Sequence, residues 1–326
     1  MHSSTHQHSA PSSWRLFFDL DGTLSDPKEG MTRSFQHALK SVGRLSPPPS
    51  ELTQFIGPPL RWTISRLFST DEPELIEQGV LGRLVRATWI ITDWFRSQTY
   101  YDNGGWRATW KGEGGGVLLN QCPHNLDIYQ WYFGVPKRVA GYASIGKYHR
   151  IEVEDEVTGY FEHENGMVGH FITTTAESPG SNRLEIVGEN GCLIFEDGRL
   201  TFAHNRASML DFIRTSPSAF DRMEYQLEDI PFQPAAEVGH AYVIEAFANA
   251  ILHGGPLVAR AEEGIHSLAL GNAIMLSQFL GKPVDLPFDA DLYEAKLLEL
   301  VRTSQFQKET REGRADDFNK SFEPYH

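Results

Sequence analysis

Three glycine-containing turn dipeptides follow one another closely in the middle of the chain. They are Asn165-Gly166, Asn190-Gly191 and Asp197-Gly198. Such pairs suit two-residue turns in which both residues need a positive φ, and these turns join antiparallel strands. Alternating residues flank the first pair, at 158–162 and 167–172. The sequence therefore predicts an antiparallel sheet in this region.

Three segments with helical spacing of apolar residues follow the expected sheet. They are His240–Leu252 with Val243, Phe247 and Ile251, then Glu263–Leu280 with Ile265, Leu268, Leu276 and Phe279, and finally Ala290–Val301. This spacing places the apolar side chains on one face of each helix, and we expect those faces to pack on the sheet. The expected fold class is α+β, a predominantly antiparallel sheet with packed helices and no Rossmann domain.

The upstream part of the chain has a different pattern, and the change lies near Gly79–Gly82. One short strand, 15–19, is followed by segments with helical spacing. A length of 326 residues suggests two domains at roughly 150 residues each. We expect a disordered polar leader at 1–13, a mostly helical fragment at 14–80 and a second domain at 81–326.

Charge and cysteine content limit the partners and the compartment. The 43 acidic residues exceed the 29 basic ones, giving a net charge of −14, which argues against a nucleic-acid partner. Two cysteines in so long a chain fit a reducing compartment. The apolar runs are far shorter than the roughly 18 residues that span a bilayer. We expect a cytoplasmic protein with no membrane association.

The most specific short motif upstream is Asp19-Leu-Asp21-Gly-Thr23, directly after an apolar strand. Alternate residues of a strand point the same way, so both carboxylates would lie together at the strand's end. One carboxylate can attack phosphorus while the other, protonated, serves the leaving group. A cation would be needed to gather the negative charges.

These residues resemble the first motif of the haloacid dehalogenase superfamily, and 55–60 looks like the start of the helical cap in phosphoglycolate-phosphatase-like members. The resemblance implies that Asp19 is the nucleophile and a Mg²⁺ ligand and that Asp21 is the general acid/base. The later Ser or Thr, the Lys and the second acidic cluster of that superfamily have no counterpart that we can place. An inert remnant is therefore favoured over an active phosphatase.

From residue 81 onward the chain resembles the C-terminal domain of the glucose–fructose oxidoreductase / inositol dehydrogenase (Gfo/Idh/MocA) family. The match is carried by segments 82–87, 105–107, 114–127, 262–264 and 281–287 in the family's order. The resemblance implies an oxidoreductase that acts on a sugar or polyol with NAD(P). It also implies a homo-oligomer that forms through an open face of the sheet.

The same resemblance implies that His124 moves the hydroxyl proton, with Asn120 in the position where Asp is commoner. Four-residue spacing puts both on one helical face, although Pro123 indicates that a helix starts or kinks there. Trp106, Arg107 and Lys111 look like substrate-pocket residues. Core packing for Trp106, a surface ion pair for Arg107 and a core position for His124 are the alternatives.

The nucleotide-binding half of such enzymes is not evident in this sequence. The Gly-x-Gly-x-x-Gly motif after a first strand is missing, and 112–117 is a near miss with Val at its third glycine position. Three hypotheses follow. The chain is an incomplete oxidoreductase-type protein, a Mg²⁺-dependent phosphatase that uses Asp19 and Asp21, or a non-catalytic oligomeric or chimeric protein.

Overall fold

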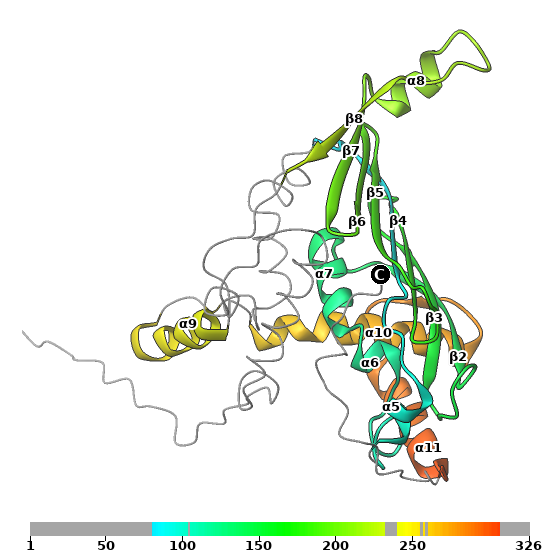
Figure 1. The fold of residues 1–326 in the computed structure, drawn as a ribbon, viewed down its shortest axis with the longest axis vertical. Helices are drawn as coiled ribbons and strands as arrows, with labels where there is room; N and C mark the ends of the chain where they lie inside the picture. The colour runs from blue at the N-terminus through cyan, green and yellow to red at the C-terminus, as the bar shows by residue number, and fades with distance from the viewer. Residues whose placement is uncertain (1–79, 104, 232–239, 255–256, 258–259, 307–326) are drawn as a thin grey trace, which may run out of the picture.

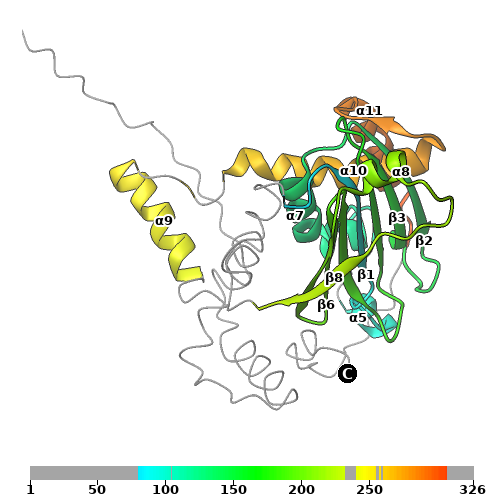
Figure 2. The same cartoon turned by 90° about the horizontal axis from the view of Figure 1, so that it is seen from above.

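The computed structural model describes residues 80–103, 105–231, 240–254, 257 and 260–306. Within this part, one sheet of nine strands is accompanied by seven α-helices and one short 3-10 helix (Figures 1 and 2). The leader, the segment with Asp19 and Asp21, and the start of the expected helical cap lie outside the described residues. The expected boundary between the two domains therefore stays a prediction.

The strand order across the sheet is β8-β7-β6-β5-β1-β4-β3-β2-β9. The bounds are β1 Leu84–Ile91, β2 Arg138–Ile145, β3 Glu154–Glu162, β4 Val168–Thr174, β5 Asn182–Gly188, β6 Gly191–Glu196, β7 Arg199–Asn205, β8 Tyr225–Ile230 and β9 Val284–Asp285. Strand β1, which comes first in the described chain, lies at the centre of the sheet between β5 and β4.

One pair of strands departs from the antiparallel pattern that the turn dipeptides predicted. Strands β1 and β4 are parallel, with Trp89 opposite Phe171, whereas each of the other neighbouring pairs is antiparallel. The sheet is therefore mixed. Turn signals report only strands that are adjacent in sequence, and β1 is separated from β4 by α5–α7, β2 and β3.

Two of the three predicted turns lie where the dipeptides indicated. Asn165-Gly166 is part of the β3–β4 connection, and Asp197-Gly198, with φ of 51° and 69°, joins β6 to β7. The third prediction is off by one residue. Gly191 already pairs with Gly188, so the residues between β5 and β6 are Glu189 and Asn190.

The helices are α5 Gln98–Asp102, α6 Val117–Asn120, α7 Pro123–Phe133, α8 Met209–Thr215, α9 His240–His253, α10 Gly264–Leu280 and α11 Ala290–Thr303, with a 3-10 helix at Ala261–Glu263. Helix α10 packs on β2 and α7, and α6 packs on β3. Their buried side chains form the core around Tyr129, Phe161 and Ile274.

Helix α10 also protects an edge of the sheet. Strand β9 is two residues long and pairs only with Arg138 and Val139 of β2. Beyond it, the backbone N–H groups of Gly141 and Ala143 donate to the side chains of Ser277 and Gln278, at 2.9 and 3.1 Å. The helix thus satisfies donors that an open edge would leave unpaired.

One expectation about helix packing is wrong, and a second is confirmed only in part, because α10 packs on β2 and buries Leu276 but not all of the predicted face. Helix α9 stands away from the sheet in both views, and its Phe247 and Ile251 are exposed (Figures 1 and 2). On α10, Ile265 and Leu268 are also exposed, because the buried face of this helix runs through Leu270, Ile274 and neighbouring small residues. A helix whose apolar residues cover more than one face leaves the choice of buried face to its packing partners.

No helix in the described part of the chain combines the length and the apolar character that crossing a membrane requires.

Candidate functional site

Tyr100 of α5 is the centre of a hydrogen-bonded group of side chains next to residues 112–116, the glycine-rich segment. Arg107 Nη1 donates to the Tyr100 hydroxyl across 2.7 Å, and its guanidinium lies 4.6 Å from the centroids of both the Tyr100 and the Trp106 rings. A second guanidinium, that of Arg96, lies 5.1 Å from the Tyr100 ring. Stacking on aromatic faces holds both cations in place.

Asn120, the last residue of α6, completes this group. Its Nδ2 donates to Glu113 Oε1 across 2.6 Å, and its Oδ1 accepts from the Tyr100 hydroxyl at 3.3 Å. Glu113 in turn lies 3.9 Å from Arg107. Arg107, Tyr100, Asn120 and Glu113 therefore form a closed circuit, which we call the hydroxyl ring. It offers donors and acceptors close together, which is what recognition of several sugar hydroxyls requires.

His124 lies in the first turn of α7, and its side chain is exposed. Helix α6 ends at Asn120 and α7 begins at Pro123, so the two residues belong to different helices. The expectation that they share one helical face is therefore wrong. The helix start that Pro123 indicated is confirmed, because Pro lacks the N–H that a helix interior needs.

The three expected pocket residues differ in their surroundings. Trp106 is 53% exposed, which excludes the core-packing alternative. Arg107 is partly buried and belongs to the hydroxyl ring, so it is more than a surface ion pair. Lys111 is exposed and takes no part in the ring as defined above. The structure thus joins Arg107 to Asn120 through Tyr100 and Glu113, two residues that the sequence did not single out, and stacks Arg107 on Trp106.

Glu154, the first residue of β3, is hydrogen-bonded to the backbone of the glycine-rich segment. Its Oε1 accepts hydrogen bonds from the backbone N–H groups of Gly116 and Leu118, at 2.9 and 3.1 Å. The side chain is 1% exposed, and burial raises the pKa of its carboxyl to about 7. The segment approaches β3 so closely that a Cβ on Gly116 would lie 2.0 Å from the Glu154 carbonyl oxygen.

Two buried residues, His149 and Asp155, form a pair that contacts the backbone of Arg96. His149 Nδ1 lies 3.1 Å from Asp155 Oδ2, and His149 Nε2 lies 2.8 Å from the Arg96 carbonyl oxygen. Burial raises the pKa of the Asp155 carboxyl, but hydrogen bonds from His149 and from the backbone of residues 147–149 outweigh it and hold the pKa below its usual value. An ionised Asp155 fixes the orientation of this histidine.

The glycine-rich segment does not fit a nucleotide. Dinucleotide sites use free backbone N–H groups at the start of a helix to hold the pyrophosphate. Here the N–H groups of Gly116 and Leu118 at the start of α6 are already bonded to the Glu154 carboxylate. Those two N–H groups are therefore not free to hold a phosphate in this structure. Nor do the described residues contain three clustered His, Cys, Asp or Glu side chains placed to hold a metal ion.

Comparison with known families assigns most of the chain. The model of the oxidoreductase family, C-terminal alpha/beta domain, matches residues 73–286. The chain belongs to the Gfo/Idh/MocA family. A second model, haloacid dehalogenase-like hydrolase, matches residues 16–87. The two matches overlap just before and within β1, so the haloacid dehalogenase-like segment runs directly into the Gfo/Idh/MocA domain.

Solved structures agree with the family. WlbA dehydrogenase from Bordetella pertussis, in complex with NADH and UDP-GlcNAcA, is 26% identical with a TM-score of 0.51, covering 67% of this chain and 60% of that one. Levoglucosan dehydrogenase in complex with NADH is 23% identical with a TM-score of 0.51, covering 70% and 64%, and shares the fold. This chain therefore spans less than two thirds of either protein.

Curated relatives match short stretches of this chain. A 5'-nucleotidase of Pseudomonas aeruginosa is 49% identical over 57 residues, which are 18% of this chain and 26% of the relative. The tyrosine-protein kinase PtkA of Mycobacterium tuberculosis is 43% identical over 49 residues, 15% of this chain and 17% of the relative. The chain spans about a quarter of the nucleotidase and less of the kinase.

Proposed function

We propose that the described domain is the substrate-binding part of an oxidoreductase that acts on a sugar or polyol. The observation that carries this proposal is the hydroxyl ring of Arg107, Tyr100, Asn120 and Glu113. The ring presents cationic donors, a carboxylate, an amide and a phenol within hydrogen-bond reach of one another. A polyhydroxylated ligand can replace some of these mutual bonds with its own.

His124 is proposed to hold and move the proton of the reacting hydroxyl. An imidazole can both accept and donate a proton, which general acid/base work requires. Its position at the start of α7, one short turn after Asn120, places it next to the hydroxyl ring along the chain. Trp106 and Arg107 contribute stacking and hydrogen bonding, with Lys111 on the same loop.

Two structural neighbours favour this class of substrate. The Bordetella pertussis dehydrogenase was solved in complex with UDP-GlcNAcA, and the second neighbour is a levoglucosan dehydrogenase. Both structures are complexes with NADH. Because the backbone N–H groups of the glycine-rich segment in this chain are bonded to Glu154, we propose that the described domain does not seat the nicotinamide cofactor itself.

A homo-oligomer that forms through the open face of the sheet belongs to the same proposal. Helix α10 covers one face of β2, and on the opposite face Tyr142 is 71% exposed. A large exposed aromatic side chain in the middle of a strand is a usual anchor for association. The cytoplasm is the proposed location, with no nucleic-acid or membrane partner.

The haloacid dehalogenase-like segment supports a second candidate. The 49% identity with part of a 5'-nucleotidase favours a phosphatase in which Asp19 attacks phosphorus and Asp21 acts as acid/base. Asp19 and Asp21 would also be the residues that hold Mg²⁺. We favour an inert remnant, because the later catalytic residues of that superfamily are not evident. A non-catalytic or chimeric protein is the third candidate.

Two sets of assays separate these candidates. Saturation-transfer NMR with a panel of hexoses and cyclic polyols should detect binding to the full chain, and Arg107→Ala should weaken it, whereas Lys282→Ala should not. Calorimetric titration with NAD⁺ and NADP⁺ should show no tight binding. Hydrolysis of a phosphate ester with Mg²⁺, lost in Asp19→Asn, would establish the phosphatase instead.

A further inference from the structure

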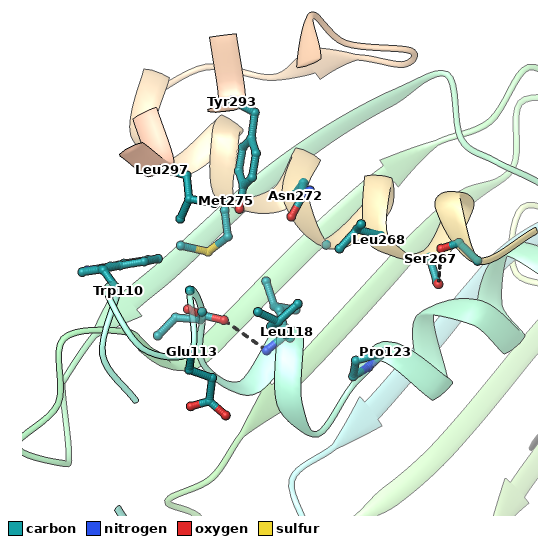
Figure 3. Close-up of a pocket in the computed structure, with 16 residues that line it drawn as sticks. Trp110, Glu113, Leu118, Pro123, Ser267, Leu268, Asn272, Met275, Tyr293 and Leu297 are labelled. Atoms are coloured by element: carbon teal, nitrogen blue, oxygen red, sulfur yellow. Dashed lines mark hydrogen bonds between the residues drawn. The ribbon is translucent and has the colours of Figure 1, made fainter. Parts of the chain in front are cut away.

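A cavity of about 410 Å³ lies between the glycine-rich segment, α10 and α11 (Figure 3). It shares Glu113 with the hydroxyl ring but extends away from the ring toward the two helices. Its lining residues are mostly apolar, and they are Trp110, Glu113, Gly114, Gly115, Leu118, Leu119, Pro123, Glu154, Gly264, Ser267, Leu268, Gly271, Asn272, Met275, Tyr293 and Leu297. Its size lies within the range of small-molecule sites.

One buried carboxylate oxygen in the wall of this cavity has no partner among the described residues. Glu154 Oε1 bonds to the N–H groups of Gly116 and Leu118, and the latter bond is the dashed line to Leu118 in Figure 3. Glu154 Oε2 is buried and accepts no hydrogen bond from the described part of the chain. A buried carboxylate oxygen without a hydrogen-bond donor destabilises the fold, and a ligand that donates a hydrogen bond to it would remove this penalty.

The charges around the cavity define what such a ligand must bring. Its lining contains two carboxylates and no Lys, Arg or His. Glu113 is already engaged, because its Oε2 accepts from the Ala108 N–H and its Oε1 from Asn120, both at 2.6 Å. Tyr293 adds no charge, since burial raises the pKa of its hydroxyl to about 12. Glu154 is therefore the carboxylate in the lining that remains available to a cationic ligand.

The rest of the lining suits an apolar body attached to a cation. Figure 3 shows Trp110, Met275, Leu297 and Tyr293 grouped at the end of the cavity between α10 and α11. Aromatic faces attract organic cations, and a methionine thioether packs against rings and alkyl chains of varied shape. A bare metal ion fits less well, because the described residues offer it no cluster of three ligands.

We propose that this cavity binds a small primary amine, whose ammonium group donates to Glu154 Oε2 while its apolar part packs against Trp110, Tyr293 and Met275. This site is separate from the proposed sugar or polyol function. The cavity lining includes Glu154 and also Glu113, which is a member of the hydroxyl ring. A bound amine would therefore contact the same segment of chain that carries Asn120.

The test uses 2-phenylethylamine and its uncharged analogue 2-phenylethanol with the full chain, by saturation-transfer NMR and calorimetry. The amine should bind and the alcohol should bind at least roughly tenfold more weakly, because only the ammonium supplies a charged donor. Glu154→Gln should weaken amine binding by a similar factor. Binding should also tighten between about pH 6 and pH 8, since the pKa of Glu154 is raised to about 7. The other titratable groups in the lining are Glu113 and Tyr293.

Two further variants make the outcome decisive. Glu156→Gln, on the same strand but paired with Lys147 at the surface, should bind the amine as wild type does. Leu268→Trp should obstruct the cavity, because Leu268 lines it and is 49% exposed at its mouth. If Glu154→Gln does not fold, Leu268→Trp still tests whether the amine binds in this cavity. The proposal is overturned if the wild type ignores the amine, if the alcohol binds equally well, or if neither cavity variant weakens binding. None of these results decides whether the hydroxyl ring binds a sugar, because that is tested by the separate sugar titration of Arg107→Ala.

Discussion

Asn120 and Glu113 are joined by a 2.6 Å hydrogen bond in which the Asn120 amide is the donor. A carboxylate at position 120, the commoner residue in the family pattern, would have no proton to donate at neutral pH. It would instead put two negative groups side by side at the edge of the glycine-rich segment. An amide at position 120 therefore suits the neighbouring Glu113 carboxylate, and the two side chains act as a hydrogen-bonded pair.

Asn120→Asp should lower the free energy of unfolding by about 1 kcal/mol near pH 8, because like charges then meet at an exposed position. The repulsion raises a carboxyl pKa in the folded state, so the loss should shrink as the pH falls toward about pH 4. Urea unfolding at several pH values measures this. Adding Glu113→Gln should restore stability. A double variant no more stable than Asn120→Asp alone would show that the two side chains are not coupled.

Glu154 should make the whole domain less stable as the pH rises. Burial raises the pKa of its carboxyl from 4.5 to about 7, so between these values the folded state holds a proton that the unfolded state has released. The stabilisation is complete below about pH 4.5 and is lost as the pH passes through about 7, a change on the order of 3 kcal/mol. Chemical denaturation from acid to neutral pH follows this loss.

Glu154→Gln is the variant that isolates this effect. An amide keeps the acceptor for Gly116 and Leu118 but does not titrate, so stability should depend less on pH between about 4.5 and 7. Glu156→Gln on the same strand, whose carboxylate is paired with Lys147 at the surface, should keep the wild-type slope there. An unchanged slope in Glu154→Gln would contradict the role of burial.

Gly116→Ala should destabilise the domain by several kcal/mol. The new Cβ would lie 2.0 Å from the Glu154 carbonyl oxygen, and backbone on both sides leaves no flexible side chain to yield. Gly264→Ala is the matched control, because nothing lies within 4 Å of its Cβ position at the start of α10. That variant should be neutral or stabilising by up to about 1 kcal/mol. Thermal unfolding of both variants gives the comparison.

The sheet and the later helices follow from the sequence where local signals exist. The Asp197-Gly198 turn, the strands around Asn165-Gly166 and the start of α7 at Pro123 all rest on residue types with strong backbone preferences. The parallel pairing of β1 with β4 has no such signal, because it depends on contacts between segments about 80 residues apart. Helix α9 has the right spacing but stands away from the strands of the described sheet (Figure 1).

Tyr100→Phe should weaken sugar or polyol binding without changing the fold. It removes the hydroxyl that joins Arg107 to Asn120 but keeps the ring on which Arg96 and Arg107 stack. We expect a loss of roughly tenfold in affinity, the value of about one charge-assisted hydrogen bond. Tyr142→Phe, on the face of β2 away from α10, is the control and should bind normally. Equal binding by Tyr100→Phe would exclude Tyr100 from the site.

The site is only partly readable in the sequence. Asn120, Arg107 and Trp106 stand in segments that match a family pattern, whereas Tyr100 and Glu113 gain their roles from the way α5 and the loop after it fold back on α6. Glu154 gives no signal either, because a carboxylate at the start of a strand normally faces solvent. Its importance comes from burial beneath the glycine-rich segment.

The central claim is that the hydroxyl ring binds a polyhydroxylated substrate, and amide-detected NMR of the full chain tests it most directly. On titration with a hexose or cyclic polyol that binds, the side-chain amide of Asn120 and the backbone amides of Arg107, Glu113 and His124 should shift together along one saturable curve. Shifts confined to other parts of the chain, or the absence of saturable shifts with every member of the panel, would contradict the account.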